Sequence, residues 1–284
     1  MNGDELRGWV GREELRDDVA TAAPLRGLAA ALDHETPCEA GDDVPPLWHW
    51  TYFLPSAPTS QLGVDGHPMK GSFLPPIDLP RRMWAGSRIQ FMRPLRVGDA
   101  IARRSTVADI VSKAGRTGPL YFVKVRHEVL SSGMPAIVEE QDIVYRNRTP
   151  PAESAATAAV AAAAATVAAK WRRRVDPSPV LLFRYSALTF NSHRIHYDRP
   201  YAEREEGYGG LVVHGPLMAT LLLDLLRREQ PQARVREFSF RAVRPILDSA
   251  HFWLCGAPEA DGTVHLWAED SNGAVATSAT AGLG

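Results

Sequence analysis

The stretch GLVVHGPLMATLLLDLLRR, residues 210–228, decides the fold of this chain. Its leucines and Met218 recur at spacings of three and four residues, which predicts an α-helix over residues 216–228. Two arginines close the helix, where cations favour the negative end of the helix dipole. Leu223 makes the helix apolar almost all round, so we expect other elements, such as a curved sheet, to wrap it.

Four strands are predicted after this helix, at residues 234–241, 250–256, 263–269 and 274–280. The tripeptide SNG at 271–273 separates the last two, and Gly after Asn between strand-like runs is a hairpin signal. A long buried helix followed by an antiparallel meander is an α+β pattern.

Candidate catalytic residues lie just before the helix, in NSHRIHYD (191–198), and at the helix start. His196 is our first candidate, because a neutral imidazole can take a proton from water near neutral pH. The alternative is a hydrogen-bonded histidine of the core or of a turn. Gly215 lies where the free N–H groups of a helix start can hold a developing negative charge. Such a pairing suits chemistry on a thioester carbonyl.

Asn191 cannot act as a base, but its amide can position a water or a carbonyl. The alternative is an Asx turn. His193, His196 and His214 with Asp198 resemble a set of zinc ligands by count alone. Their spacing matches no metal signature and no Cys is near, so we predict that the protein binds no metal.

An Ala-rich segment divides the chain. Residues 150–170 are low in complexity and predict a linker between an N-terminal part, 1–149, and a C-terminal part, 171–284. Both parts share an order of features. FMRPL (91–95) precedes SSG (131–133) in the first, and AVRPI (242–246) precedes SNG (271–273) in the second. This order favours an internal duplication, and a coincidence of common turn residues is the alternative.

In the first part, helices are predicted over residues 17–33 and in the short aromatic segment 46–52, which has Pro at its first turn. A Gly/Pro-rich loop, 63–79, then leads to Arg81, Arg82 and Trp84. These three residues suit phosphate contacts and stacking on a planar base. A solvated basic turn with a core Trp is the alternative.

Composition narrows the class of partner and the compartment. The net charge of −1 argues against nucleic-acid and acidic-membrane binding, and no apolar run has the ~18 residues of a membrane helix. Cys38 and Cys255 form no disulfide framework, which indicates a reducing interior. The first 18 residues are rich in charge without an apolar segment, so we expect no signal peptide and a cytoplasmic location.

The motif NSHRIHYD followed by GLVVHGP resembles the MaoC-like hydratase family, also called hydratase 2, of the hot-dog fold. HWTYFL (49–54), FLPP (73–76) and RRMWAG (81–86) resemble the N-terminal dehydratase-like half of double hot-dog proteins. The branch it resembles most is that of mesaconyl-C4-CoA (3-methylfumaryl-CoA) and itaconyl-CoA hydratases. The resemblance implies an α+β double hot-dog fold, in which two long helices are each wrapped by an antiparallel β-sheet. It also implies a catalytic second half, and a first half that helps to form an acyl-CoA tunnel.

The resemblance also assigns roles, with one departure. The family motif is Asp-x-Asn-Pro-x-His, and this chain has Asn191, His193 and Arg194 at the first three named positions, so that only His196 matches. His196 would then act alone with Asn191 orienting the water, or His193 or Asp198 would supply the second proton function. Gly215 is implied as the oxyanion donor. We expect Arg194 and His214 to bind substrate, since Arg194 replaces a rigid Pro and could meet a carboxylate. The alternative is that Arg194 bonds Asp198 or a backbone carbonyl and only shapes the loop.

We therefore predict a hydro-lyase that adds water across the double bond of a short branched dicarboxylic enoyl-CoA, mesaconyl-C4-CoA or itaconyl-CoA, to give citramalyl-CoA. No cofactor is expected beyond the CoA of the substrate, no nucleic-acid or membrane partner is expected, and assembly as a homodimer stays open. One alternative is a 3-hydroxyacyl-thioester dehydratase of lipid metabolism. Another is a non-catalytic subunit that binds acyl thioesters.

Overall fold

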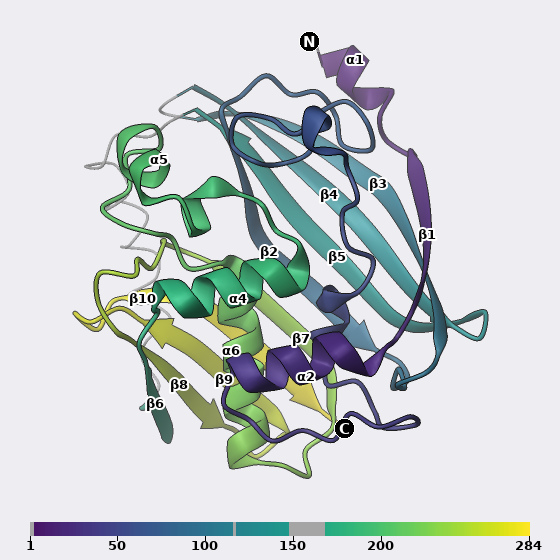
Figure 1. Cartoon of the computed structure of the whole chain (residues 1–284), viewed down its shortest axis with the longest axis vertical. Coiled ribbons are helices and arrows are strands. Elements are labelled where there is room, and N and C mark those ends of the chain that lie inside the picture. The colour runs from purple at the N-terminus through teal and green to yellow at the C-terminus, as the bar shows by residue number, and fades with distance from the viewer. Residues whose placement is uncertain (1–2, 116–117, 148–167) are drawn as a thin grey trace.

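A ten-stranded antiparallel sheet forms the frame of the protein (Figure 1). The computed structural model describes residues 3–115, 118–147 and 168–284. The strands are β1 Glu13–Val19, β2 Arg81–Phe91, β3 Ala100–Gly115, β4 Gly118–Ser131, β5 Met134–Arg146, β6 Trp171–Val175, β7 Val235–Ala242, β8 Phe252–Pro258, β9 Thr263–Glu269 and β10 Val275–Leu283. The four strands predicted in the second half are confirmed as β7 to β10, with ends shifted by up to three residues.

The two halves of the sheet repeat one strand order. The first half runs β1-β3-β4-β5-β2 and the second, read from its outer edge, runs β6-β8-β9-β10-β7. β2 and β7 pair antiparallel in the middle, from Gly86 opposite Arg241 to Gln90 opposite Glu237. Gly86 is needed at this junction, because a Cβ there would collide with the carbonyl oxygen of Phe240. The sheet is therefore continuous across both halves.

The hydrogen bonds of the Arg-Pro turns repeat as well. The donor and acceptor pairs are Met92 N and Arg93 N to Ala136 O at 2.9 and 3.2 Å, and Val243 N and Arg244 N to Ala276 O at 2.8 and 3.1 Å. Strand order and turn geometry thus both agree with an internal duplication.

The long helix of the second half is α6, Gly215–Glu229, and all its residues from Leu217 to Leu226 are buried. It packs against β6, β8, β9 and β10, and it crosses the face of these strands in Figure 1. The other helices are α1 Gly3–Arg7, α2 Ala22–Ala31, α4 Pro179–Thr189 and α5 Arg199–Arg204, with single 3-10 turns η1 Trp48–Thr51, η2 Thr59–Gln61 and η5 Arg194–His196. The predicted helix 216–228 is confirmed.

Two predictions for the first half need correction. Residues 17–19 belong to β1, so the helix predicted over 17–33 is reduced to α2. The expected second long helix does not occur among the described residues of the first half, where segment 46–52 contains only η1. Prolines at 55, 58, 68, 75, 76 and 80 follow that turn, and Pro in a helix interior removes a hydrogen bond and clashes with the preceding turn.

The predicted linker, 150–170, lies outside the described residues except for its last three. Within the described ranges, none of the helices is long and apolar enough to span a bilayer.

Candidate active site

A cavity of about 1070 Å³ opens between the two halves, and both halves line it. The second half contributes the turn before α5 and the start of α6. The first half contributes β2 and part of the loop 63–79. Ligand pockets commonly occupy ~300–1000 Å³. The cavity therefore has room for a short acyl group and part of a carrier.

His196 lies on the wall of this cavity, at the end of η5. Its Nδ1 is 2.7 Å from the carbonyl oxygen of Val212. A carbonyl only accepts hydrogen bonds, so Nδ1 carries the proton and Nε2 is left as an acceptor. Burial lowers the pKa of His196 to about 4. The ring is therefore neutral at neutral pH, and its Nε2 can accept a hydrogen bond.

His214 supports this ring from behind. The two imidazoles stack with centroids 3.6 Å apart and planes 19° apart, and His214 Nε2 is hydrogen-bonded to Ser186 Oγ at 2.8 Å. Burial also holds the pKa of His214 well below its usual value. His214 does not line the cavity, so the predicted contact with substrate is replaced by packing behind His196.

Gly215 lines the cavity as the first residue of α6. No acceptor for its N–H is found in the part of the chain that the structure describes. Pro216, the next residue, has no N–H to compete for the same acceptor. This helix start can therefore offer an N–H to a developing oxyanion in the cavity.

Asn191 and His193 also line the cavity. Asn191 Oδ1 accepts the N–H of His193 at 3.0 Å, which is the Asx turn considered as the alternative. The Asn191 amide thus shapes the turn before η5, residues 191–193, which we call the catalytic turn of the candidate site, and its oxygen is already hydrogen-bonded to the His193 N–H. The His193 ring meets the His196 ring edge to face at 5.4 Å, and burial lowers its pKa, so it is neutral too.

Arg194 and Asp198 face away from the cavity and bind each other. Arg194 Nε and Nη2 donate to Asp198 Oδ2 at 2.9 and 2.7 Å, and Asp198 Oδ1 accepts the N–H of Tyr201 at the start of α5. Neither residue lines the cavity. The predicted roles of Arg194 as the partner of a substrate carboxylate and of Asp198 as a proton donor are therefore wrong, because a local ion pair holds both side chains.

Arg81, Arg82 and Trp84, at the start of β2, differ in the contacts that they make. Arg81 is buried in an ion pair with Glu206, with Nε 3.3 Å from Oε2, and Trp84 donates its ring N–H to Ser87 Oγ at 2.9 Å while packing against Trp50. These contacts make Arg81 and Trp84 structural, although both border the cavity. Arg82 also lines the cavity, and no carboxylate of the described residues lies within 4.0 Å of it in an ion pair.

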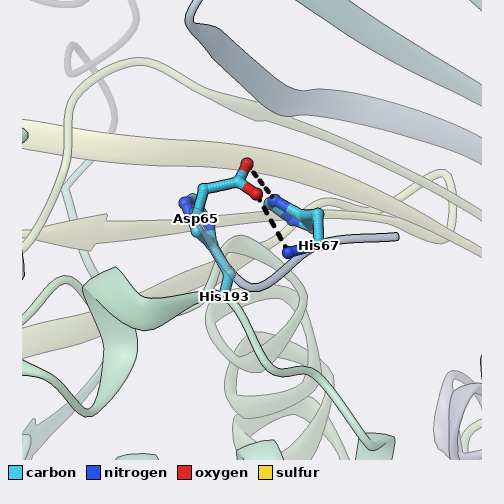
Figure 2. A group of neighbouring side chains, drawn as sticks. All are labelled: Asp65, His67 and His193. Atoms are coloured by element: carbon cyan, nitrogen blue, oxygen red, sulfur yellow. Dashed lines mark hydrogen bonds and ion pairs between the residues drawn. The ribbon is translucent and has the colours of Figure 1, made fainter. Parts of the chain in front are cut away.

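Sequence reasoning missed Asp65 and His67, which enter the cavity from the first half (Figure 2). His67 Nδ1 lies 2.9 Å from Asp65 Oδ2, and the His67 ring centroid is 4.1 Å from that of His193. Burial would raise the pKa of Asp65, but the hydrogen bonds from His67 hold it well below its usual value. The Asp-x-His spacing of Asp65 and His67 in loop 63–79 is a sequence pattern that could have predicted this pair.

Within the described chain, Asp65, His67 and His193 are also the group that could hold a metal ion, with one ligand atom of each within 4.8 Å of the others. This set differs from the three histidines considered from the sequence. The Asp65–His67 hydrogen bond already accounts for its geometry, and the charge of Arg82 acts on both histidines and opposes a bound cation. The absence of a metal stays a prediction.

Known proteins share this sequence and architecture. The profile of hydroxyacyl-thioester dehydratase type 2 matches residues 47–248. Mesaconyl-C4-CoA hydratase of Chloroflexus aurantiacus is 47% identical over 288 residues, covering 100% of both chains. A solved MaoC-like dehydratase superposes with a TM-score of 0.73 at 15% identity, over 97% of this chain and 98% of that chain. A Mycobacterium tuberculosis protein with a double hot-dog fold gives 0.58 at 13%, over 97% and 96%. These structures confirm the predicted α+β double hot-dog fold.

Proposed function

The chain belongs to the hydroxyacyl-thioester dehydratase type 2 family of MaoC-like proteins, and on that premise we propose that it is a hydro-lyase that hydrates mesaconyl-C4-CoA. The name of the relative that is 47% identical over the full length supports this substrate. Itaconyl-CoA, the other substrate predicted from the sequence, has the same charge and nearly the same size. Citramalyl-CoA would be the product of either hydration.

One observation carries the proposal. The free Nε2 of His196 and the free N–H of Gly215 border the same cavity, since the His196 ring is fixed by Val212 three residues before the start of α6. Nε2 can accept a hydrogen bond from water and activate it for attack on the β-carbon. The Gly215 N–H can hold the thioester oxygen as the enolate forms, and one such donor is typically worth about 3–4 kcal/mol.

Arg82 is our candidate for the free carboxylate of the substrate, in place of Arg194. In mesaconyl-C4-CoA that carboxylate is bonded to the carbon that water attacks, so its partner must lie close to the catalytic histidines. Arg82 lines the same cavity as His67 and His193, and after burial its charge contributes to lowering the pKa of both. A guanidinium in a cavity suits a carboxylate because it binds in bidentate fashion.

The test is hydration by the purified protein of mesaconyl-C4-CoA and of crotonyl-CoA, which lacks the carboxylate. We expect a far higher kcat/KM for the dicarboxylic ester, and we expect Arg82→Met to remove most of that preference. Arg236→Met, at an exposed arginine of β7, is the matched control. Equal kcat/KM on the two esters in the wild type would contradict the substrate assignment.

The cavity volume of about 1070 Å³ favours a second candidate, a 3-hydroxyacyl-thioester dehydratase of longer chains, because a branched C5 acid fills only part of it. Higher turnover on long uncharged acyl chains than on mesaconyl-C4-CoA would select that activity. Lack of turnover on every thioester would instead support a binding subunit.

We also propose that catalysis needs no metal or added cofactor, that the enzyme is cytoplasmic, and that it forms a homodimer.

A further inference from the structure

A loop of the first half is fastened to the catalytic turn of the second. The backbone N–H of Arg194 donates to Asp65 O at 2.9 Å, Arg194 Nη1 donates to Val64 O at 3.0 Å, and Ser192 Oγ donates to Gly66 O. Gly66 has a φ of +87°, and a Cβ there would collide with the Ser192 carbonyl oxygen. This loop is therefore part of the active-site wall.

The loop delivers an oriented imidazole. Asp65 Oδ1 accepts the backbone N–H of His67 at 3.0 Å, while Asp65 Oδ2 lies 2.9 Å from Nδ1. An ionised carboxylate only accepts hydrogen bonds, so Nδ1 carries the proton and Nε2 is an acceptor. A carboxylate in this position fixes the tautomer of the ring and stabilises the imidazolium that forms when Nε2 takes a proton.

Among the described residues of the second half, no histidine at the cavity is paired with a carboxylate of that half. Asn191 holds the position of the family's aspartate, cannot take a proton, and has its oxygen engaged by His193 N–H. His196 donates its Nδ1–H to the neutral carbonyl oxygen of Val212, and a carbonyl stabilises an imidazolium less than a carboxylate would. Water has two hydrogens, and Nε2 of His196 can accept only one of them.

We infer that Asp65 and His67 form the proton-transfer pair of this active site, with His67 as a catalytic residue and Asp65 as its positioning residue. This inference rests on the proposed hydratase function. In hydration, the water oxygen bonds to the β-carbon while Nε2 of His67 takes one of its protons and His196 holds the other. The electron pair of the double bond moves into the enolate at Gly215. The imidazolium then returns its proton to the α-carbon, which leaves His67 neutral and gives net addition of H and OH.

The charges around His67 are consistent with this cycle. Burial and the neighbouring Arg82 and Lys70 lower its pKa, whereas Asp65 opposes them. A resting neutral ring that Asp65 stabilises only when protonated is suited to take a proton and give it back.

The deciding experiment measures exchange of the α-protons in D2O by mass spectrometry. The probe is the saturated analogue of the substrate, 3-carboxybutanoyl-CoA, which cannot lose water. Exchange requires only the α-carbon base and the oxyanion donor. We expect His67→Asn to slow exchange at least ~100-fold. His265→Asn, at a partly exposed histidine of β9, is the matched control.

Hydration rates complete the test. His67→Asn should lower kcat at least ~100-fold, and Asp65→Asn should lower kcat at least tenfold with little change in KM, at unchanged thermal unfolding temperature. Wild-type exchange by His67→Asn would overturn the inference. So would stoichiometric zinc bound by Asp65, His67 and His193, with activity that chelation removes. If the wild-type protein hydrates no dicarboxylic enoyl-CoA, the proposed function is refuted instead. The exchange assay separates the two failures, because the ratio of the exchange rates of variant and wild type does not depend on hydration.

Discussion

The histidines before α6 differ in role because each ring nitrogen has a different partner. His196 donates its Nδ1–H to the carbonyl oxygen of Val212 and leaves Nε2 facing the cavity. His214, stacked behind the His196 ring, is hydrogen-bonded through Nε2 to Ser186. The sequence identified His196 and Gly215 because a motif and a helix start mark them. It could not show that Asp65 and His67 come in from over a hundred residues away, because that approach depends on tertiary contacts.

We predict that His196→Ala lowers hydration turnover at least ~100-fold, because it removes the acceptor that holds the attacking water. His193→Ala is the informative comparison, since His193 lies between His196 and His67. Steady-state kinetics with mesaconyl-C4-CoA check this. An active His196→Ala enzyme beside a dead His193→Ala enzyme would show that the wrong histidine was chosen.

Arg194→Met should impair the two CoA esters about equally, because the guanidinium braces the catalytic turn through Asp198 and Val64 and does not face the cavity. The measurement is kcat/KM on mesaconyl-C4-CoA and crotonyl-CoA. A selective loss on the dicarboxylic ester would restore the role predicted from the sequence.

Treatment with a strong chelator should leave the rate unchanged, because the neutral imidazoles of His67 and His196 and the N–H of Gly215 supply the proton acceptors and the oxyanion donor that hydration needs. Metal content and rate are measured on the same sample. Zinc at one equivalent per chain, with activity lost on its removal, would refute metal independence.

At the scale of elements, the helical spacing of its leucines predicted α6, because that pattern reports burial on a face. Strand-like runs and a hairpin signal predicted the strands that it packs against. The first-half helix failed because prolines stop the segment after η1. An unexpected feature of α6 is Asp224, which is buried and binds arginines from two elements. Its carboxylate oxygens lie 2.9 Å from Arg173 Nη1 and 2.7 Å from Arg228 Nε.

Asp224→Ala should destabilise the protein by about 2–4 kcal/mol, since it leaves arginines unpaired at a buried site, although their partial exposure moderates the loss. Denaturant unfolding measures the difference, with Asp109→Ala at an exposed position of β3 as control. A change below that of the control would mean that the arginines find water or other acceptors.

At the scale of the whole molecule, one sheet joins the two halves, and buried or half-buried histidines from both halves lie at the cavity or directly behind it. His67, His127, His193, His196 and His214 all have a pKa lowered from 6.5, with burial as the largest cause. The sequence contains these histidines in plain view, but their burial near one cavity could not be predicted from it, because that burial depends on how the two halves pack together.

Stability should therefore fall as pH drops below about 6.5. The unfolded chain binds protons there while the folded chain does not, so the folded state loses ground progressively, for His196 until about pH 4. Calorimetry from pH 8 to pH 4.5 checks this. His127→Gln should flatten the dependence, and a flat Tm across the range in wild type would contradict the burial of these rings.

One detail distinguishes the two copies of the scaffold. Val44 N bonds to Leu95 O at 2.7 Å as Val213 N bonds to Ile246 O at 2.9 Å, so Pro45 and Pro46 hold the places of His214 and Gly215. Proline has no N–H, and the first copy therefore cannot hold an oxyanion. Duplicated genes that become fused can specialise separately. Here the first copy contributes Asp65 and His67 to the shared cavity, whereas the helix start that can hold an oxyanion comes from the second copy.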